Sequence, residues 1–361
     1  MNIIISAGGT GGHIYPAVAI INKFKEKEKD LNVLYIGTHN RMEKDIIPSM
    51  GIKYEAIEIY GFSKTMFFRD IKNIFLIKKA VNRCIKIMKD FKPDIVIGVG
   101  GYVTMPVITA AKKLGIPVAV HEQNSIPGKT NKLFTKNVDL VCTSYENSNK
   151  YFKNAKKVIY TGNPCGENAL TTKKIPKESL GFSKNKKLLL FVSGSLGSAT
   201  INDFATKFLS LVNDNDIFEV LYITGESYYE EFTKDKEFAK SVKVLPFLNN
   251  MSGLLSDVDL IISRAGAGTI SEILALEVPS ILIPSPYVAN NHQYYNALDL
   301  KTKKVSIMCE EKDLDAQKMY QSIKDLLSGN DEYQKMKENL KKLDMKNAST
   351  IIYEQIKELL K

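Results

Sequence analysis

The sequence has 361 residues, 44% hydrophobic and 25% charged, proportions that fit a folded protein of two domains and exclude a disordered or fibrous chain. Its net charge of +10 is unevenly placed, because residues 1–165 hold 25 Lys and Arg against 13 Asp and Glu, a net +12, and the remainder is −2. The basic half predicts an anionic partner, either nucleic acid, anionic lipid or a phosphorylated substrate, unless the lysines only serve solubility.

Short β-branched runs alternate with amphipathic helical stretches along the first half of the chain. The N-terminal run lacks the basic residues and the length of a signal peptide, and no stretch of about 18 residues is apolar enough to span a membrane. We predict strands at Asn2–Ser6, Val33–Gly37, Tyr54–Ile59, Asp94–Val99, Val118–His121, Leu140–Thr143 and Val158–Tyr160.

The second half repeats this arrangement after residues 163–187, which are rich in Lys, Thr, Pro and Gly and suit an inter-domain linker. Its strands are predicted at Leu188–Ser193, Glu219–Thr224, Val242–Pro246, Leu260–Ser263 and Ser280–Ile283. Near-continuous apolar strands separated by helices indicate parallel sheets covered on both faces. The predicted fold class is α/β, with two Rossmann-like domains that face a central cleft. Their bounds are 1–163 and 164–345, followed by a C-terminal helix at 346–361 whose packing on the first domain the sequence leaves open.

The first glycine-rich turn is Gly8-Gly9-Thr10-Gly11-Gly12, between a strand and a helix. It is not a Walker A sequence, because no Lys-Ser/Thr follows, and it does not match G-x-G-x-x-G. Four glycines allow backbone amides at a helix N-terminus to approach a ligand closely, so we predict a diphosphate site there. A tight turn that needs positive φ is the alternative.

His13 and Glu122 are the candidate general bases. His13 lies at the start of the first helix, where the positive end of the helix dipole disfavours imidazolium and favours a neutral, proton-accepting ring. Glu122 ends a buried strand in the loop His121-Glu122-Gln123-Asn124. Two structural alternatives stay open: His13 bonded only to backbone, and Glu122 orienting His13 or a substrate hydroxyl.

A second glycine-rich segment, Gly266-Ala267-Gly268, again exposes amides to an anion in the second half. The next four residues, Thr269 to Glu272, have the spacing of a capping box with Thr269 as the N-cap. The alternative is that the Glu272 carboxylate accepts hydrogen bonds from ribose hydroxyls. Both interpretations remain open at Glu272.

The segment between residues 66 and 90 contains a predicted amphipathic helix with a surface for a membrane. One face carries an ordinary core stripe of Ile74, Ile77, Val81, Cys84 and Met88. The opposite face carries Lys72, Lys79, Arg83 and Lys86, with Leu76 and Phe75 beside these cations and Phe67 and Phe68 just before the helix. Exposed apolar groups among lysines suit an anionic membrane surface, although a solvated basic face is the alternative. No recognised nucleic-acid-binding motif accompanies these cations, so we expect no nucleic-acid partner.

Six motifs together resemble the MurG family, the peptidoglycan N-acetylglucosaminyltransferases, in order over nearly the whole chain. They are Gly8-Gly9-Thr10-Gly11-Gly12-His13, Gly100-Gly101-Tyr102-Val103-Thr104, His121-Glu122-Gln123-Asn124, Gly162-Asn163-Pro164, Arg264-Ala265-Gly266-Ala267 and His292-Gln293-Tyr294-Tyr295-Asn296-Ala297. The resemblance implies a two-domain GT-B fold. It also implies an inverting transfer of N-acetylglucosamine from UDP-N-acetylglucosamine to the C4 hydroxyl of undecaprenyl-diphosphate-muramyl-pentapeptide. No metal or other cofactor and a peripheral place on the cytoplasmic face of the plasma membrane are further implications.

The resemblance also implies roles for single positions. Thr10, Gly11, Gly12 and Asn124 match positions that contact the donor sugar or the acceptor diphosphate, and Tyr102 lies in the second motif. The uridine-diphosphate site is matched by Ser195, Leu248, Ala267, Gly268, Thr269, Glu272 and Gln293. Two departures from the family pattern are expected to weaken donor binding. Gly166 stands where many relatives have Arg, so a cation is missing unless Arg264 or a lysine replaces it. Leu196 stands where relatives have Gln.

Other functions compete with this expectation. Within the same fold, the alternatives are a glycolipid synthase that uses diacylglycerol and a UDP-sugar epimerase, which would not need the basic amphipathic helix. A nucleotide-sugar-binding regulator is the non-enzymatic alternative, and the pairing of His13 with Glu122 argues against it. The four cysteines, Cys84, Cys142, Cys165 and Cys309, have no metal-ligand spacing and are expected to be reduced thiols in a cytosolic protein.

Overall fold

The computed structural model describes residues 1–361 except 62–66, 134–135, 137, 195–196, 344 and 346, and it describes only the backbone of residues 67–74. The chain divides into two compact units. Unit 1 consists of Met1–Glu167 and Asn347–Lys361, and unit 2 consists of Asn168–Lys346. The sequence placed the corresponding boundaries after residues 163 and 345.

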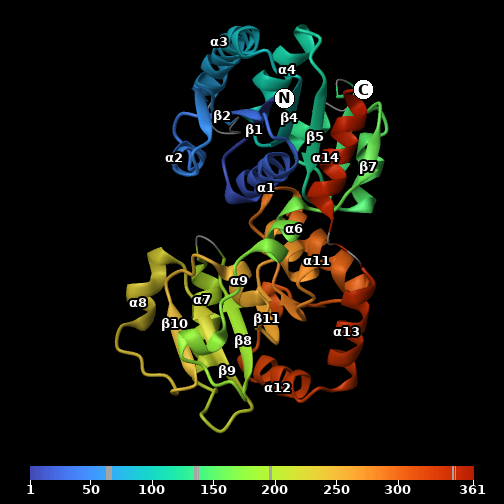
Figure 1. Cartoon of the computed structure of the whole chain (residues 1–361). Helices are drawn as coiled ribbons and strands as arrows, with labels where there is room; N and C mark the ends of the chain where they lie inside the picture. The colour runs from blue at the N-terminus through green and yellow to red at the C-terminus, as the bar shows by residue number, and fades with distance from the viewer. Residues whose placement is uncertain (62–66, 134–135, 137, 195–196, 344, 346) are drawn as a thin grey trace. The chain divides into compact units, whose positions relative to one another are not determined.

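Unit 1 contains a parallel sheet with the strand order β3-β2-β1-β4-β5-β6-β7 (Figure 1). The strands are β1 (Asn2–Ala7), β2 (Asn32–Thr38), β3 (Lys53–Ile57), β4 (Ile95–Gly100), β5 (Val118–Glu122), β6 (Leu140–Thr143) and β7 (Val158–Tyr160). The helices are α1 (Gly11–Lys27), α2 (Glu43–Ser49), α3 (Phe67–Phe91), α4 (Thr104–Lys113), α5 (Lys129–Leu133), η2 (Glu146–Phe152) and α14 (Ala348–Leu359). Helix α6 (Pro164–Thr171) begins in unit 1 and ends in unit 2.

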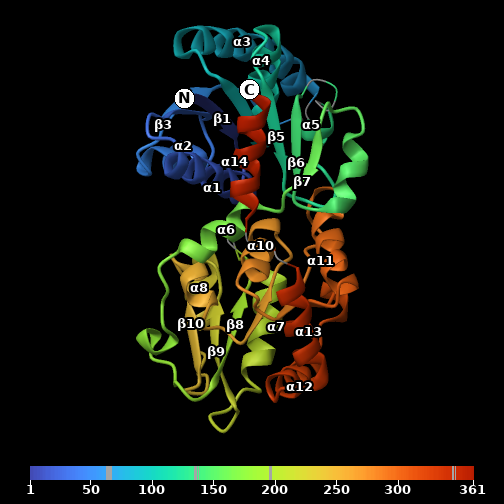
Figure 2. The same ribbon diagram turned by 45° about the vertical axis from the view of Figure 1, so that its right-hand side comes forward.

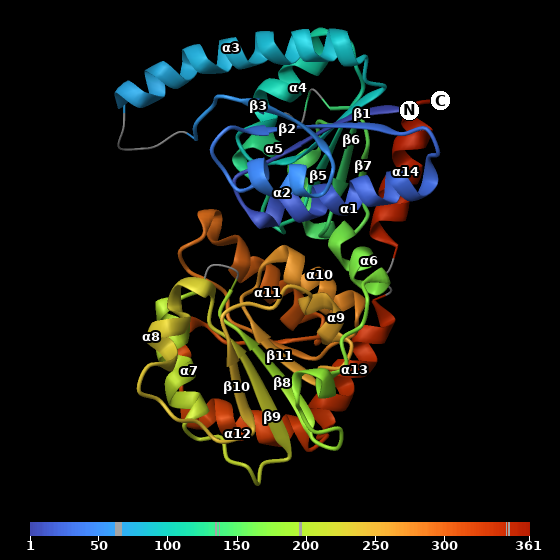
Figure 3. The same ribbon diagram turned by 60° about the vertical axis from the view of Figure 1, so that its left-hand side comes forward.

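Successive side chains of each strand in unit 1 enter different cores, because they point to opposite faces of the sheet. Ile4 belongs to the core under α3 and α4, whereas Ile3 and Ile5 belong to the core under α1 and α14. Figure 3 shows the sheet between these two helical layers. The C-terminal helix α14 packs beside α1, as Figure 2 shows, and buries Ile352 and Ile356. The last helix of the chain is thus part of the first unit.

Unit 2 contains a second parallel sheet with the order β10-β9-β8-β11-β12-β13. Its strands are β8 (Lys187–Val192), β9 (Phe218–Ile223), β10 (Val242–Leu245), β11 (Leu260–Ser263), β12 (Ser280–Leu282) and β13 (Ile307–Met308). Its helices are η3 (Lys177–Leu180), α7 (Ala199–Leu209), η4 (Glu226–Tyr228), α8 (Tyr229–Thr233), α9 (Met251–Leu255), α10 (Ala267–Ala275), η5 (Ala289–Asn291), α11 (His292–Thr302), η6 (Glu311–Asp313), α12 (Ala316–Leu327) and α13 (Asp331–Lys342). Helices α7 and α12 cover one face of this sheet.

The predicted strands are confirmed, with ends that differ by no more than two residues. The two-residue strand β13 was missed, and α6 lies inside the segment predicted as a linker. In each unit the strand order reverses beside its first strand, at β1 and β4 in unit 1 and at β8 and β11 in unit 2. Open α/β sheets bind ligands at the carboxyl ends of strands at such a switch point.

Candidate functional site

Two loops cross at the carboxyl ends of β1 and β4. The Gly8 amide donates to the Gly100 carbonyl oxygen at 3.2 Å. Gly101 has a φ of +88°, and a Cβ atom there would lie 2.4 Å from the Gly8 oxygen. Only glycine fits this crossing, because any side chain would meet backbone. The crossing brings the first two sequence motifs together at the switch point.

The His13 ring lies against this crossing. Its Nδ1 is 3.2 Å from the Gly8 carbonyl oxygen and 3.3 Å from Thr10 Oγ1. A carbonyl oxygen can only accept, so the contact with Gly8 requires a proton on Nδ1. In the neutral ring the basic lone pair is then on Nε2, which is the nitrogen suited to take a proton from a substrate. His13 is therefore bonded to backbone, as the structural alternative predicts, and its role as a base stays a prediction.

The N-terminus of α1 offers amides to an anion. The amides of Gly8 and Gly9 turn inward, to the Gly100 oxygen and to Glu43 Oε2, each at 3.2 Å. In the part of the chain that the structure describes, the amides of residues 10–12 donate to no protein acceptor. Such amides at the start of a 17-residue helix suit a phosphate group.

Glu122 is buried, and its carboxylate holds the loop that follows β5. Oε1 accepts from the Asn124 amide at 2.9 Å and from its Nδ2 at 3.4 Å. Oε2 accepts from the Gly128 amide at 3.1 Å and from Asn131 Nδ2 at 2.8 Å. Burial raises the pKa of Glu122, and these hydrogen bonds oppose the rise. All four donors lie within residues 124–131, so Glu122 orders the segment that follows β5, and His13, which the sequence offered as a partner, is not among these donors.

The side chain of Gln123 joins the strand ends of unit 1. Its Nε2 donates to the carbonyl oxygens of Gly12 and Val99, each at 3.0 Å. The end of β5 is thereby tied to the start of α1 and the end of β4. Asn124 follows and is half-buried, and Tyr102 is half-buried against the core under α4. The predicted residues of unit 1 thus gather at the carboxyl ends of its central strands.

Unit 2 has its own glycine-rich turn after β8. Gly194 and Gly197 have φ values of +114° and +75°, a region that favours glycine. A Cβ atom at Gly197 would lie 2.6 Å from the Thr224 carbonyl oxygen, so the turn closely approaches the end of β9. Ser195, predicted to contact the donor, lies outside the described residues.

Arg264 follows β11, and other side chains of unit 2 engage it. Its Nη2 donates to Ser198 Oγ at 2.8 Å and forms an ion pair with Glu311. The two charged side chains are only 11% and 10% exposed. Glu311 neutralises this guanidinium. Arg264 is therefore a poor replacement for the arginine that the family resemblance predicts at the position of Gly166.

Helix α10 begins at Ala267, so the predicted capping box is wrong. The N-cap is Gly266, and Thr269 and Glu272 lie inside the helix. Burial raises the pKa of Glu272 to about 7, against a hydrogen bond with Ser252 that lowers it. Glu272 lies in the middle of α10 and is hydrogen-bonded to Ser252, so the ribose interpretation of Glu272 stays a prediction.

Three further predicted donor contacts lie at the same edge of unit 2. Gly268 is half-buried in the first turn of α10, and Leu248 is half-buried in the segment that follows β10. Gln293 is in the first turn of α11, and its Oε1 accepts from the Ser285 amide at 2.9 Å. These residues follow β10, β11 and β12, at the carboxyl ends of the strands.

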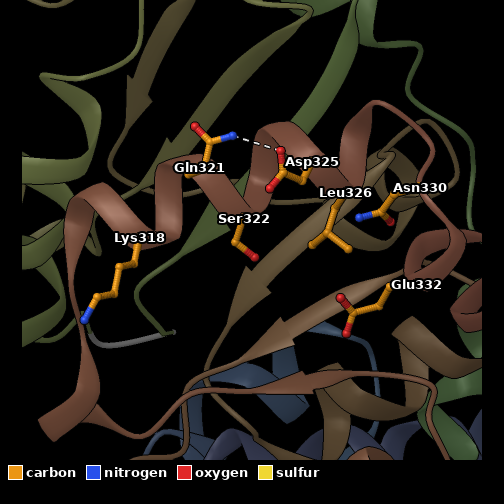
Figure 4. Close-up of a pocket in the computed structure, with 7 residues that line it drawn as sticks. All are labelled: Lys318, Gln321, Ser322, Asp325, Leu326, Asn330 and Glu332. Atoms are coloured by element: carbon orange, nitrogen blue, oxygen red, sulfur yellow. Dashed lines mark hydrogen bonds between the residues drawn. The ribbon is translucent and has the colours of Figure 1, made fainter.

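A surface pocket lies away from these loops, on the outer side of α12 and α13. Figure 4 shows its lining, which is mostly polar and includes Gln321 hydrogen-bonded to Asp325 at 2.8 Å. None of the predicted site residues lines it. Among the described residues, no three His, Cys, Asp or Glu side chains are placed to hold a metal ion.

Helix α3 carries the residues predicted to contact a membrane. Phe75 is 68% exposed, Lys79 is exposed and Leu76 is half-buried. Arg83 is paired with Glu55 at 3.1 Å, so its charge is partly balanced. The side chains of Phe67, Phe68 and Lys72 lie outside the description, but the backbone places both phenylalanines inside α3, which corrects the prediction that they precede it.

The core stripe predicted on α3 is confirmed where the structure describes it, at Val81, Cys84 and Met88. No helix in the described ranges is both long and apolar enough to cross a membrane.

Two family models match the chain. The N-terminal domain of glycosyltransferase family 28 matches residues 3–143, and the C-terminal domain of that family matches residues 188–352. A UDP-N-acetylglucosamine--N-acetylmuramyl-(pentapeptide) pyrophosphoryl-undecaprenol N-acetylglucosamine transferase of Caldanaerobacter subterraneus is 44% identical over 99% of this chain and 100% of its own length. The transferase of the same name from Bacillus cytotoxicus is 42% identical over the full length of both chains. The chain belongs to the MurG family of glycosyltransferases.

Solved structures agree with this membership. The crystal structure of Acinetobacter baumannii MurG has a TM-score of 0.77 and 26% identity, and the match covers 99% of both chains. A UDP-GlcNAc 2-epimerase from Neisseria meningitidis has a TM-score of 0.68 at 16% identity over 99% of this chain and all of the other, which shows a shared fold alone. The fold class is therefore α/β of GT-B type, built from two Rossmann-like units.

Two carboxylates that organise unit 1 were missed in the sequence. Glu43 is fully buried under the glycine-rich turn. Glu167 binds Lys23 at 2.9 Å and also Ser349 and Thr350 at the start of α14, each at 2.6 Å. Both glutamates lie near the start of short helices, and their partners other than Lys23 are amides and hydroxyls, so no charge pattern marks them.

Proposed function

We propose that the chain transfers N-acetylglucosamine from UDP-N-acetylglucosamine to the C4 hydroxyl of undecaprenyl-diphosphate-muramyl-pentapeptide. The observation that carries this proposal is the full-length match to transferases named for this reaction. The arrangement of both glycine-rich turns at switch points supports it.

The acceptor side of the reaction uses unit 1. The amides of residues 10–12 bind the acceptor diphosphate at the start of α1. Nε2 of His13 takes the proton of the acceptor hydroxyl, whose oxygen attacks the anomeric carbon of the donor sugar. The proton stays on Nδ1, which donates to the Gly8 carbonyl oxygen, and this hydrogen bond keeps the ring in the required tautomer.

The donor side uses unit 2. As the bond from the acceptor oxygen to the anomeric carbon forms, the bond to UDP breaks, and the electron pair leaves with the diphosphate. The start of α10, including Ala267 and Gly268, stabilises this charge, and Glu272 accepts from ribose hydroxyls. We propose that Thr269, Leu248 and Gln293 contact the nucleotide sugar, and that neither a metal nor another cofactor takes part.

The proposed place of the protein is the cytoplasmic face of the plasma membrane. Phe75 and Leu76 enter the interface of an anionic bilayer while Lys79 binds its headgroups, an arrangement supported by the high exposure of Phe75. Sedimentation with anionic vesicles tests this: Phe75→Ser should release the protein into the supernatant. Exposed Lys318 on α12 supplies the control, because Lys318→Ser should leave sedimentation unchanged.

A transfer assay tests the reaction. Purified protein receives UDP-N-acetylglucosamine with and without a short-chain analogue of the lipid acceptor. We expect UDP release only with the acceptor, together with a lipid-linked disaccharide. Conversion of the donor sugar without the acceptor would instead indicate an epimerase or a hydrolase, and binding of UDP-sugar with no turnover would indicate a regulator.

A further inference from the structure

Glu43 is a buried carboxylate directly beneath the glycine-rich turn, and the mechanism above does not use it. It is 0% exposed, at the start of α2. Oε1 accepts from the Thr38 amide at 3.1 Å and from the Thr38 hydroxyl at 2.6 Å. Oε2 accepts from the Gly9 amide at 3.2 Å. One side chain thus joins the end of β2 to the turn that follows β1.

Two glycines, Gly8 and Gly37, pack closely against Glu43. A Cβ atom at Gly8 would lie 2.4 Å from Glu43 Oε1, and one at Gly37 would lie 2.9 Å from Glu43 Cγ. A side chain at Gly8 would displace the carboxylate, and one at Gly37 would meet both Glu43 Cγ and the Tyr54 hydroxyl oxygen, which would lie 2.4 Å from its Cβ atom. The turn and the glutamate are packed as one unit.

The charge of Glu43 is not balanced by a cation. Within the described residues, no Lys, Arg or His side chain lies within ion-pair distance of its carboxylate, so amides and a hydroxyl alone compensate for its burial. A buried carboxylate without a cation is costly, and a negative charge near a diphosphate would weaken the binding of that anion. A benefit from Glu43 therefore has to come from its geometry and not from its charge.

We propose that Glu43 is a positioning residue for the acceptor site, an inference that rests on the proposed function. By drawing the Gly9 amide inward, it sets the turn that leaves the amides of residues 10–12 for the acceptor diphosphate. The same turn fixes the Gly8 carbonyl oxygen, which holds Nδ1 of His13. Glu43 thereby acts on both acceptor binding and the orientation of the base.

Steady-state kinetics of Glu43→Gln test this proposal. The amide retains an oxygen for Thr38 but presents an NH₂ group to the Gly9 amide, so two donors face each other. We expect the KM for the lipid acceptor to rise about tenfold, as for the loss of one hydrogen bond to a charged group, with a lower kcat. The KM for UDP-N-acetylglucosamine should stay unchanged, because the donor binds unit 2.

Asp139→Asn is the matched control. Asp139 is also a buried carboxylate of unit 1, but its Oδ2 accepts from the Val118 amide at 2.9 Å. Val118 begins β5, so this contact lies at the amino ends of the strands, away from the glycine-rich turn. Replacement of Asp139 should lower thermal stability and leave the acceptor KM as in the wild type. If Glu43 only stabilises the fold, the two variants behave alike.

Further variants keep the test decisive if Glu43→Gln does not fold. Glu43→Asp keeps the charge but is too short to reach Thr38 and Gly9 together, and Thr38→Val removes only one hydrogen bond to Oε1. Both should raise the acceptor KM, Thr38→Val by less. A folded Glu43 variant with wild-type acceptor KM and kcat, or with tighter acceptor binding, would overturn the proposal. Absence of transfer by the wild type would instead refute the proposed function itself.

Discussion

The carbonyl oxygen of Gly8 lies 3.2 Å from Nδ1 of His13, five residues further along the chain. This contact places a proton on Nδ1 and the basic lone pair on Nε2. Gly8 is also part of the turn whose following amides are offered to a diphosphate. In the proposed mechanism, one turn therefore orients a base and an anion site together, which is what attack by the hydroxyl of a phosphorylated acceptor requires.

Replacement of His13 should remove the base without disturbing the turn. In His13→Asn the side-chain amide can still donate to the Gly8 oxygen, but no basic nitrogen remains. We expect kcat to fall by about 10²- to 10⁴-fold, the usual contribution of a general base, with little change in the KM for the donor. Stopped assays with saturating acceptor measure this, and wild-type turnover in the variant would remove His13 from the mechanism.

Replacement of Glu122 should act mainly on stability. Glu122→Gln weakens the hydrogen bonds from Asn124, Gly128 and Asn131 to a buried group, at a cost of about 1–3 kcal/mol in the free energy of unfolding. We expect a smaller loss of kcat than in His13→Asn. Urea unfolding and turnover measured on the same preparations check this. A stable Glu122→Gln protein with the larger loss of kcat would reverse the assignment of the base.

A methyl group at Gly100 should displace the His13 ring. The φ of Gly100 is +116°, and its Cβ atom would lie 2.6 Å from Cδ2 of His13. We expect Gly100→Ala to lower kcat at least tenfold, with the donor KM unchanged. Gly115→Ala is the control, because Gly115 has a φ of +70° and its Cβ atom would have no neighbour within 4 Å. An equal loss of kcat in both variants would show that backbone strain, and not displacement of the His13 ring, lowers turnover.

The titration of Glu272 should appear in both stability and donor binding. Burial raises its pKa from 4.5 to about 7, so the folded state binds more protons between these values. Protonated Glu272 contributes no more than about 3 kcal/mol to the free energy of unfolding. This contribution is present below pH 4.5 and is lost as pH rises through about 7. In the proposed donor site the ionised carboxylate accepts from ribose hydroxyls, so binding of UDP-N-acetylglucosamine should tighten over the same rise in pH.

Calorimetry and urea unfolding at about pH 6 and about pH 8 measure both effects. The matched variant is Glu272→Gln, in which both pH dependences should disappear. If donor affinity in the wild type does not change across this range, the ribose role of Glu272 is wrong.

Glu167 should hold α14 on unit 1. Burial opposes its ionisation, but hydrogen bonds from Lys23, Ser349 and Thr350 lower its pKa to about 2. Its stabilising contribution is thus present above the ordinary pKa of 4.5 and is lost as pH falls through about 2. We expect Glu167→Gln to lose about 1–3 kcal/mol and to expose α14 to protease. Unchanged proteolysis of the C-terminus in the variant would contradict this role.

The alternation of apolar strands and helices was sufficient to predict both sheets, because parallel strands buried on both faces have an unmistakable composition. The short strand β13 escaped because two residues form no pattern. The capping box failed because Thr269 and Glu272 have the right spacing inside a helix that begins earlier, at Ala267.

The role of Glu122 could not be decided from the sequence, since its partners Gly128 and Asn131 meet it only after the loop has folded. Glu43 was invisible for a related reason. Its hydrogen bond with Gly9 connects residues 34 positions apart, and a single sequence carries no record of that contact.

The anomeric configuration of the product tests the central claim most directly. Protein is incubated with UDP-N-acetylglucosamine and a soluble analogue of the lipid-linked acceptor, and the isolated product is examined by proton NMR. A single in-line displacement predicts N-acetylglucosamine joined through an inverted, β-configured bond to the C4 oxygen of the muramyl sugar. An α-configured bond, another linkage position, or sugar that is released and never joined to the acceptor would contradict the account.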